Sequence, residues 1–410
     1  MVRYAYKKSP FLKKRLFDAN VDPADIRSLR DIIKLPMITK DDVRQAQQES
    51  PPYGGLLAVN SKIARIYTTT GTTGTPTRFC LTYNDLERAS NSAAKGFWSC
   101  GIRPEDTVQI ISNIGGAYVG TQNLDTMLRI GCCTIAAGVG NTKRQLDLIR
   151  NGGTTCLISP AWYSLYLAKV ATEEHLFDPL DSKVRKIITS FEPVPPSTKK
   201  RMSEAWNAKV REVYGLSDVH MLQSAECDEV AGLHEIFDWT MIEIVDPKTG
   251  EWLDEGEAGE IVVTNLYREG TPLLRFNTKD IAKWIDLKGK CNCGRTSARH
   301  SSILGRSDSM IKIKAANVWP AAIEGVLNKH SELNGEYQIV VDRVEDLDVL
   351  KVIVELRKDT DPSGQLRSAI VQEIKETVNV TADLVELVPD GSLQTTEFKS
   401  KRVVDLRKPI

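Results

Sequence analysis

The stretch NTKRQLDLIRNGGTTCLIS, residues 141–159, predicts a helix followed by a strand. Its first part begins with an Asn or Thr suited to a helix N-cap and ends in two glycines, and TTCLIS is an apolar run of strand length. The same alternation extends from about residue 83 to 215. It includes a helical segment, NDLERASNSAAKGFWSC (84–100), and the strand-like runs VQIIS (108–112), CCTIAA (132–137) and VRKIITS (184–190). Such repeated units predict parallel strands joined by crossover helices.

The pattern changes after residue 214. MIEIVD (241–246) and IVVTNL (261–266), with turn-rich sequence between them, predict antiparallel strands in a small β-barrel-like part. From about residue 305, further strand-like runs and an amphipathic helix at about 365–378 predict a compact α+β unit. We therefore expect an α/β protein in two domains. Residues 1–304 form a large domain of mixed or parallel sheets flanked by helices, and residues 305–410 form a small α+β domain.

Composition excludes several classes of function. The 410 residues include 54 Lys plus Arg and 54 Asp plus Glu, so no long-range field attracts nucleic acid or an acidic membrane surface. No apolar run approaches the roughly 18 residues of a membrane span, and the N-terminus lacks a signal-peptide core. We expect a cytoplasmic protein, with a homodimer as the default assembly. Eight cysteines in a reducing compartment indicate metal binding or chemistry more than a disulfide scaffold.

A threonine and glycine loop lies in IYTTTGTTGTPTRF, residues 66–79. Its glycines let successive backbone N–H groups point into one concavity, and its hydroxyls add donors around a polyphosphate. The residues concerned are Thr69, Thr70, Gly71, Thr72, Thr73 and Gly74. The spacing of a Walker loop is absent. Taken alone, the segment fits an ordinary surface loop equally well.

Three charged residues later in the chain suit a nucleotide site. Asp218, in YGLSD (214–218), follows a strand-like run and could hold Mg²⁺ at a sheet edge. Asp280, in PLLRFNTKD (272–280), could accept two hydrogen bonds from a ribose, and Arg306 could pair with a phosphate. Considered separately, a helix or turn cap is the commoner explanation of Asp218, and a surface charge is the commoner explanation of Asp280 and Arg306.

The order of these motifs resembles the acyl-adenylate-forming enzymes, and most of all the phenylacetate-CoA ligase branch. The threonine loop, YGLSD, PLLRFNTKD, GRSDSMIKIKAANVWP (305–320) and the C-terminal KSKRVVDLR (399–407) follow one another as in that family. The resemblance assigns Thr69–Thr77 to the ATP phosphates and Lys399, on the small domain, to catalysis. It also implies an adenine-lining pair, a ring near the adenine, a magnesium ligand, a ribose clamp with its phosphate partner, and a hinge. In that order these are Glu192 with Pro193, Tyr214 with Gly215, Asp218, Asp280 with Arg306, and Asp308.

The resemblance implies an activity and its cofactors. A carboxylic acid is activated with ATP and Mg²⁺ to an acyl-adenylate with release of pyrophosphate, and the acyl group then passes to CoA. The growing charge at the α-phosphate requires preorganised cations. Two departures concern the site: Thr75 stands where the loop usually has Lys, and Asp218 is one methylene shorter than the usual Glu. A non-CoA acceptor such as an amine, or a decayed zinc-bearing binding protein, remains the alternative.

Cys227, His234, Cys291 and Cys293 predict a structural zinc site. Four N/S ligands in two close pairs suit a closed tetrahedral zinc, with reduced free thiols as the equal alternative. Some relatives of the phenylacetate-CoA ligase branch resemble this arrangement, which favours the metal. All four residues lie outside the motifs assigned to ATP, so we expect the zinc to hold loops together.

The acid pocket is predicted from SNIGGAYVGTQN (112–123), which lines up with the substrate segment of aryl ligases. Gly116 leaves space, and Tyr118 could pack on an aromatic acid or equally belong to the core. Ala137 and Phe191 complete the expected walls. An amino- or hydroxy-substituted aryl acid is the first expectation, and a small aliphatic acid is the second.

Overall fold

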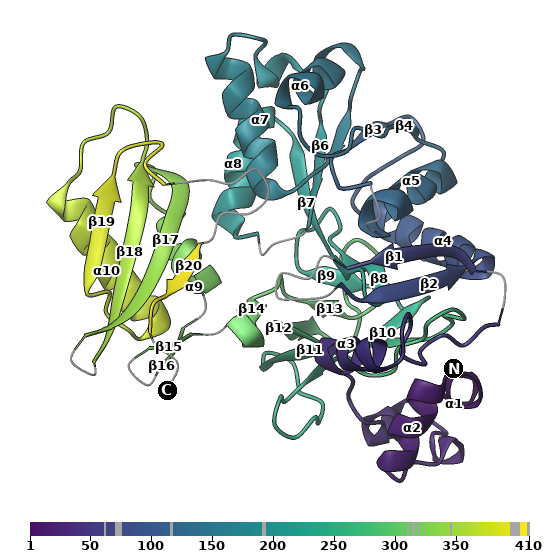
Figure 1. The fold of residues 1–410 in the computed structure, drawn as a ribbon. Coiled ribbons are helices and arrows are strands. Elements are labelled where there is room, and N and C mark those ends of the chain that lie inside the picture. The colour runs from purple at the N-terminus through teal and green to yellow at the C-terminus, as the bar shows by residue number, and fades with distance from the viewer. Residues whose placement is uncertain are drawn as a thin grey trace. The chain divides into compact units, whose positions relative to one another are not determined.

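The computed structural model describes residues 1–60, 63–69, 76–114, 118–190, 194–309, 311–313, 316–318, 320–344, 347–393 and 402–407 (Figure 1). It divides into two compact units. The first consists of Met1–Val194 with Lys199–Ile303, and the second of Pro195–Thr198 with Leu304–Ile410. Within the described ranges, no helix is long and apolar enough to cross a membrane.

The first unit contains the predicted parallel sheet with its crossover helices. Its strand order is β4-β3-β5-β6-β7, and each neighbouring pair is parallel. The strands are β3 (Thr107–Ile110), β4 (Cys133–Ile135), β5 (Cys156–Ile158), β6 (Lys186–Thr189) and β7 (Lys209–Leu216). Helix α4 (Tyr83–Ser99) precedes β3, and the helices between the strands are α5 (Tyr118–Ile130), α6 (Thr142–Asn151), α7 (Ala161–Glu173) and α8 (Pro196–Trp206). The α/β alternation that the sequence predicts from residue 83 is thus confirmed.

The predicted antiparallel strands continue the same hydrogen-bonded series. Strand β7 is parallel to β6 on one side and antiparallel to β8 on the other, and the order then runs β8-β9-β13-β12-β11-β10. These strands are β8 (His220–Ala225), β9 (Leu233–Glu235), β10 (Thr240–Val245), β11 (Ala258–Asn265), β12 (Phe276–Asp286) and β13 (Arg299–His300). A separate antiparallel hairpin of β1 (Ile63–Thr68) and β2 (Arg78–Thr82) flanks the threonine loop.

The N-terminal region is helical and is fastened to β12. It contains α1 (Val2–Lys8), α2 (Pro10–Asp18), two short 3-10 helices (Pro23–Asp25 and Leu29–Lys34) and α3 (Lys40–Glu49). Ile38 donates its N–H to Arg275 O at 2.9 Å, and its carbonyl accepts from Asn277 N at 2.8 Å. The buried guanidinium of Arg275 also donates to the carbonyls of Ile33 and Leu35. The chain before α3 is therefore part of the first unit's core.

The second unit has its own α+β core. Its main sheet has the order β19-β18-β17-β20, and buried apolar side chains of the sheet and its two helices form one cluster. These strands are β17 (Leu333–Val344), β18 (Leu347–Leu356), β19 (Leu384–Val388) and β20 (Val403–Asp405), and the helices are α9 (Pro320–Leu327) and α10 (Gly364–Val378). The remaining short elements are β14 (Gly305–Arg306), the 3-10 turn Ser307–Ser309, β15 (Ile311–Ile313) and β16 (Ala316–Val318). A further 3-10 turn of the chain is Pro179–Asp181, before β6.

Candidate active site and metal centre

Tyr214 and Asp280 meet although 66 residues separate them in the chain. The Tyr214 hydroxyl, near the end of β7, donates to Oδ2 of Asp280 on β12 at 2.8 Å. The ring of Tyr214 is buried and packs edge-on against His300 at 5.8 Å between ring centroids. Two residues that the family resemblance assigns to adenosine are thus brought together by different strands.

Gly215 follows Tyr214 where two strands approach closely. A Cβ added at Gly215 would lie 1.8 Å from the carbonyl oxygen of Met221, so no side chain fits there without a backbone shift. The turn between β7 and β8 then contains Asp218, whose side chain is buried. Arg268 Nη1 donates to the Asp218 carbonyl at 2.7 Å and fixes this turn.

Asp218 faces a cation that the sequence analysis does not select. Its Oδ1 lies 3.5 Å from Nζ of Lys40, the first residue of α3. Within the described part of the chain, this oxygen has no hydrogen-bond partner. A buried carboxylate oxygen without a hydrogen bond is suited to a cationic ligand, because burying a charge is costly unless it is paired and hydrogen bonded.

The threonine loop is described at its two ends. Thr69 and Thr77 face each other, with 2.7 Å between their hydroxyl oxygens and 3.0 Å from Thr69 N to Thr77 O. Both are buried, so the hairpin of β1 and β2 closes the base of the loop firmly. Several other predicted site residues lie outside the described residues: Thr70, Gly71, Thr72, Thr73, Gly74, Gly116, Glu192, Pro193, Phe191 and Lys399.

Tyr118 lies in a buried aromatic stack at the start of α5. Its ring is 1% exposed and stacks on Tyr67 at 4.4 Å, and its hydroxyl is 3.4 Å from Nδ1 of His220. Burial, and then the charge of Arg268, lower the pKa of His220 to about 3, so its imidazole is neutral. Ala137, the other described pocket residue, is also buried. Tyr118 stays a predicted pocket residue, and its packing shows that it also supports the core.

In the second unit, Arg306 and Asp308 form an ion pair. Nε and Nη2 of Arg306 donate to the two carboxylate oxygens of Asp308 at 2.8 and 2.7 Å. Both side chains are about half exposed. The predicted phosphate partner and the predicted hinge residue therefore contact each other directly.

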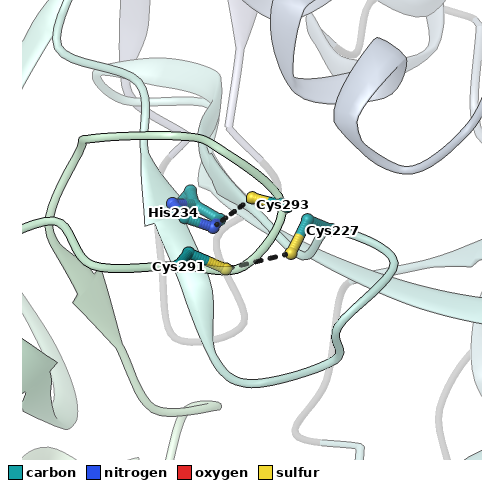
Figure 2. Close-up of side chains that lie close together, drawn as sticks. All are labelled: Cys227, His234, Cys291 and Cys293. Atoms are coloured by element: carbon teal, nitrogen blue, oxygen red, sulfur yellow. Dashed lines mark hydrogen bonds between the residues drawn. The ribbon is translucent and has the colours of Figure 1, made fainter.

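The four predicted zinc ligands converge from three segments (Figure 2). Cys227 follows β8, His234 lies on β9, and Cys291 and Cys293 lie between β12 and β13. Their ligand atoms are all within 4.8 Å of one another. Cys227 Sγ is 3.7 Å from Cys291 Sγ, and Cys293 Sγ is 3.4 Å from Nε2 of His234. Tetrahedral zinc spaces two thiolates about 3.8 Å apart and a thiolate and an imidazole nitrogen about 3.5 Å apart, so these residues fit the ion.

The pKa values of His234 and Cys293 suit a metal, whereas burial raises the pKa of the Cys227 thiol to about 11 in the absence of an ion. Burial lowers the pKa of His234, which keeps its imidazole neutral and able to ligate. For Cys293, burial acts in the opposite sense, but hydrogen bonds from Arg295 and the neighbouring thiols lower its pKa to about 7. Nδ1 of His234 is 3.3 Å from the Ser297 hydroxyl, which orients the ring.

The loop with two of the cysteines is held by one arginine and one glycine. Arg299 donates to Asp286 Oδ2 at 2.9 Å and to the Lys290 carbonyl at 3.1 Å, so it spans the base of the loop. Gly289 has φ +66°, and an added Cβ would lie 1.9 Å from Thr296 O. The approach of Cys291 and Cys293 to His234 thus depends on backbone geometry as well as on the thiols.

Comparisons with known proteins agree with this architecture. The AMP-binding enzyme family matches residues 24–266, and the AMP-binding enzyme C-terminal domain matches residues 315–407. A phenylacetate-coenzyme A ligase of Thermus thermophilus is 32% identical over 430 residues, which cover all of this chain and 94% of that protein. The chain therefore belongs to the AMP-binding enzyme family, in its phenylacetate-CoA ligase-like branch.

Further relatives extend the similarity to structure. A phenylacetate-coenzyme A ligase of Escherichia coli is 30% identical over 419 residues, covering 99% of this chain and 92% of that protein. A crystal structure of 2-hydroxyisobutyryl-CoA ligase in complex with 2-HIB-AMP has a TM-score of 0.90 and 28% identity, and covers 98% of this chain and 86% of that chain. These proteins are named for one aromatic and one aliphatic acid.

Sequence reasoning misses Lys40, His220 and Arg268. Lys40 belongs to the sequence ITKDD, where Thr39 and Asp42 form a capping box. This pattern predicts the start of a helix, but it does not predict that Lys40 contacts Asp218. His220 lies two residues after Asp218 in the sequence, and this closeness to a predicted site residue could have singled it out. Arg268 is a buried arginine whose partners Tyr67 and Asp218 are distant in the chain, and no local pattern reveals these contacts.

Proposed function

We propose that the protein is an AMP-forming acid ligase that activates a carboxylic acid with ATP and transfers the acyl group to CoA. The observation that supports this best is the hydrogen bond from Tyr214 to Asp280, which joins two motifs of the predicted nucleotide site. Full-length similarity to phenylacetate-coenzyme A ligases supports the same reaction. The structural neighbours with bound acyl-AMP support an adenylate as the intermediate.

The reaction has two balanced steps. A carboxylate oxygen of the acid attacks the α-phosphorus of ATP, and the bond to pyrophosphate breaks as the acyl-adenylate forms. The thiol of CoA then attacks the acyl carbonyl, loses its proton, and AMP leaves. In this scheme Asp280 binds the ribose diol and Tyr214 positions Asp280. Lys399 neutralises charge at the α-phosphate during the first step.

Asp218 is the proposed ligand of Mg²⁺. When bound, this ion neutralises phosphate charge in the first step. The buried turn of Asp218, fixed by Arg268, presents one carboxylate oxygen with Lys40 beside it. A carboxylate of this kind suits a hard cation that keeps several waters. Thr69 to Thr77 are proposed to hold the phosphates through hydroxyl and backbone N–H groups.

The cysteine and histidine cluster is proposed to bind structural zinc. Its four protein ligands would complete a tetrahedral shell and leave no position for substrate, which is typical of structural zinc. The ion would join the end of β8 to the loop after β12. This proposal is separate from the chemistry of acid activation.

A planar aromatic acid is the proposed substrate, with a small aliphatic acid as the second candidate. The aromatic relatives support the first, and the 2-hydroxyisobutyryl-CoA ligase structures support the second. Tyr118, which stacks on Tyr67, is the aromatic residue proposed to pack on such an acid.

Pyrophosphate release over a panel of aromatic and aliphatic acids, with and without CoA, tests the proposal. We expect release that depends on the acid and accelerates with CoA. Release that CoA does not accelerate would indicate another acceptor, such as an amine. No release with any acid would reject the enzyme and favour a zinc-bearing binding protein.

A further inference from the structure

Strand β12 bulges at the residue that is proposed to bind the ribose. In its pairing with β11, three residues of β12, Thr278–Asp280, lie opposite Ile261 alone. Extra residues of this kind interrupt the ladder of backbone hydrogen bonds, bend the strand and re-aim a side chain. Asp280 is the last of the three, and its carboxylate accepts a hydrogen bond from the Tyr214 hydroxyl. The bulge therefore decides where this carboxylate lies.

Lys279, the middle residue of the bulge, has a left-handed backbone conformation. Its φ is +65°, a value that residues with a Cβ disfavour. Such an outlier persists only where the surrounding structure imposes it, and outliers concentrate at functional sites. The contacts of the neighbouring side chains show what imposes this one.

Two side chains of the bulge replace the missing backbone partners. Asn277 Oδ1 accepts from Lys279 N at 2.9 Å. Thr278 Oγ1 accepts from Asp280 N at 3.1 Å and donates to the Ile261 carbonyl at 2.8 Å. Asn277 and Thr278 are each only 4% exposed, so water has little access to these groups. Because unpaired buried backbone groups are costly, the two side chains hold the bulge in one conformation.

Asn277 is itself fixed by Glu260, a buried residue of β11. Its Nδ2 donates to Oε2 of Glu260, which leaves Oδ1 to accept from Lys279 N. The same carboxylate pairs with the Lys279 ammonium, with 3.2 Å between Nζ and Oε1. A carboxylate is only an acceptor, so this contact fixes which way the amide points. A chain of contacts thus leads from β11 through Asn277 to the backbone that precedes Asp280.

We propose that Asn277 and Thr278 are positioning residues for ribose recognition, an inference that rests on the proposed role of Asp280. Neither side chain needs to touch the nucleotide. They hold the bulge in the conformation in which the Asp280 carboxylate meets both Tyr214 and the ribose diol. A carboxylate that accepts from two hydroxyls at once binds more tightly when it is oriented beforehand, because ordering it on binding would reduce the affinity. The left-handed backbone of Lys279 is retained for this orientation.

Binding of MgATP and of the magnesium complex of 2′,3′-dideoxy-ATP tests the inference, because the two nucleotides differ only in the ribose hydroxyls. Wild-type protein should bind MgATP about 10- to 100-fold more tightly, as expected for hydrogen bonds to a charged group. Thr278→Val keeps the shape of the side chain and removes its hydroxyl. We expect it to weaken MgATP binding about 5- to 20-fold and dideoxy-ATP binding less than about 3-fold, so the ratio of the two affinities falls several-fold.

The matched control is Thr155→Val. The Thr155 hydroxyl also accepts from a backbone N–H, that of Thr107, and donates to an oxygen, Oδ1 of Asp106. It precedes β5, outside the proposed nucleotide motifs, so the affinity ratio should not change. Thr278→Ser keeps the hydroxyl and should keep the ratio. Thermal unfolding of each variant is measured first, and Asn277→Leu replaces Thr278→Val if the latter does not fold.

A double substitution tests whether Thr278 acts through Asp280. If it does, adding Thr278→Val to Asp280→Ala should weaken MgATP binding no further. An additive loss, or equal weakening of both nucleotides by Thr278→Val, would overturn the inference and make the bulge merely structural. A wild type that binds both nucleotides equally would reject the proposed role of Asp280 and the inference with it. A discriminating wild type whose ratio survives Thr278→Val would reject the positioning role alone.

Discussion

Strand β8 (His220–Ala225) has a proposed site beyond each of its ends, and the two sites are built differently. Beyond the C-terminal end, four ligand atoms from Cys227, His234, Cys291 and Cys293 converge within 4.8 Å. Before the N-terminal end, Asp218 has Lys40 at 3.5 Å and a carboxylate oxygen without a hydrogen bond from the described residues. The four side chains of the first set can coordinate a metal ion without any ligand from outside the protein. In the proposed function, the second set is completed by Mg²⁺ and the substrate.

This difference has a physical basis. A structural metal site stabilises the fold most when protein atoms satisfy the whole coordination shell. A site for phosphoryl chemistry instead needs preorganised groups whose partners are the substrate and the transition state. We therefore expect substitutions in the cysteine and histidine cluster to change stability, and substitutions around Asp218 and Asp280 to change nucleotide kinetics.

The largest expected effect belongs to Lys399→Ala. This substitution tests whether the proposed nucleotide site around Asp218 and Asp280 needs a lysine from the second unit. Adenylation should fall by about 10³-fold, because a cation at the α-phosphate is lost from the transition state. Turnover of supplied acyl-adenylate with CoA should stay nearly normal, and Lys329→Ala, an exposed lysine of the same unit, should have no effect. Equal loss of both half-reactions would contradict a role of Lys399 in the first half-reaction alone.

The substitution Cys293→Ser tests the proposed zinc site in the cysteine and histidine cluster. Loss of one of four ligands should release the metal and lower the melting temperature by roughly 10 °C, which corresponds to about 3 kcal/mol or more. Metal analysis and thermal unfolding measure this, with Cys133→Ser, an exposed thiol outside the cluster, as control. Wild-type protein with far less than one equivalent of zinc would refute the proposed metal.

The substitution Asp280→Ala tests whether Asp280 contributes to nucleotide binding. Without the proposed ribose clamp, the KM for ATP should rise about 10- to 100-fold, since a charged hydrogen-bonding partner is lost. Tyr214→Phe removes a single hydroxyl that positions Asp280, so we expect a rise of a few fold. Steady-state kinetics at saturating acid distinguish the two, and an unchanged KM in Asp280→Ala would place the ribose elsewhere.

The last expected effect is a pH dependence of stability at His220. Burial lowers the pKa of His220 to about 3, so between an ordinary value of about 6.5 and 3 the unfolded chain binds a proton that the folded chain does not. The contribution is present above pH 6.5 and is lost as the pH falls, by up to about 1.4 kcal/mol per pH unit. Denaturant titrations of His220→Asn should show a shallower acid slope. The exposed His175→Asn is the control, and an equal slope in both variants would contradict a buried neutral His220.

Much of the fold can be predicted from the sequence because its signals are local. The segments at 141–151 and 156–158 form α6 and β5 as expected. The convergence of the four proposed zinc ligands follows less directly, since Cys227 and Cys291 are 64 residues apart and need the pairing of β9 with β13. Lys40 is beyond such reasoning, because its contact with Asp218 depends on hydrogen bonds between Ile38 and β12. Tyr118 shows a further limit: apolar surroundings predict a core residue and a pocket wall equally.

The most direct test of the ligase account is the stoichiometry of products from one acid that supports pyrophosphate release. With ATP, CoA and that acid, the account predicts equal amounts of AMP, pyrophosphate and acyl-CoA thioester, and no AMP when the acid is left out. Formation of ADP and phosphate, or of AMP without the acid, would contradict activation of the carboxylate as an acyl-adenylate.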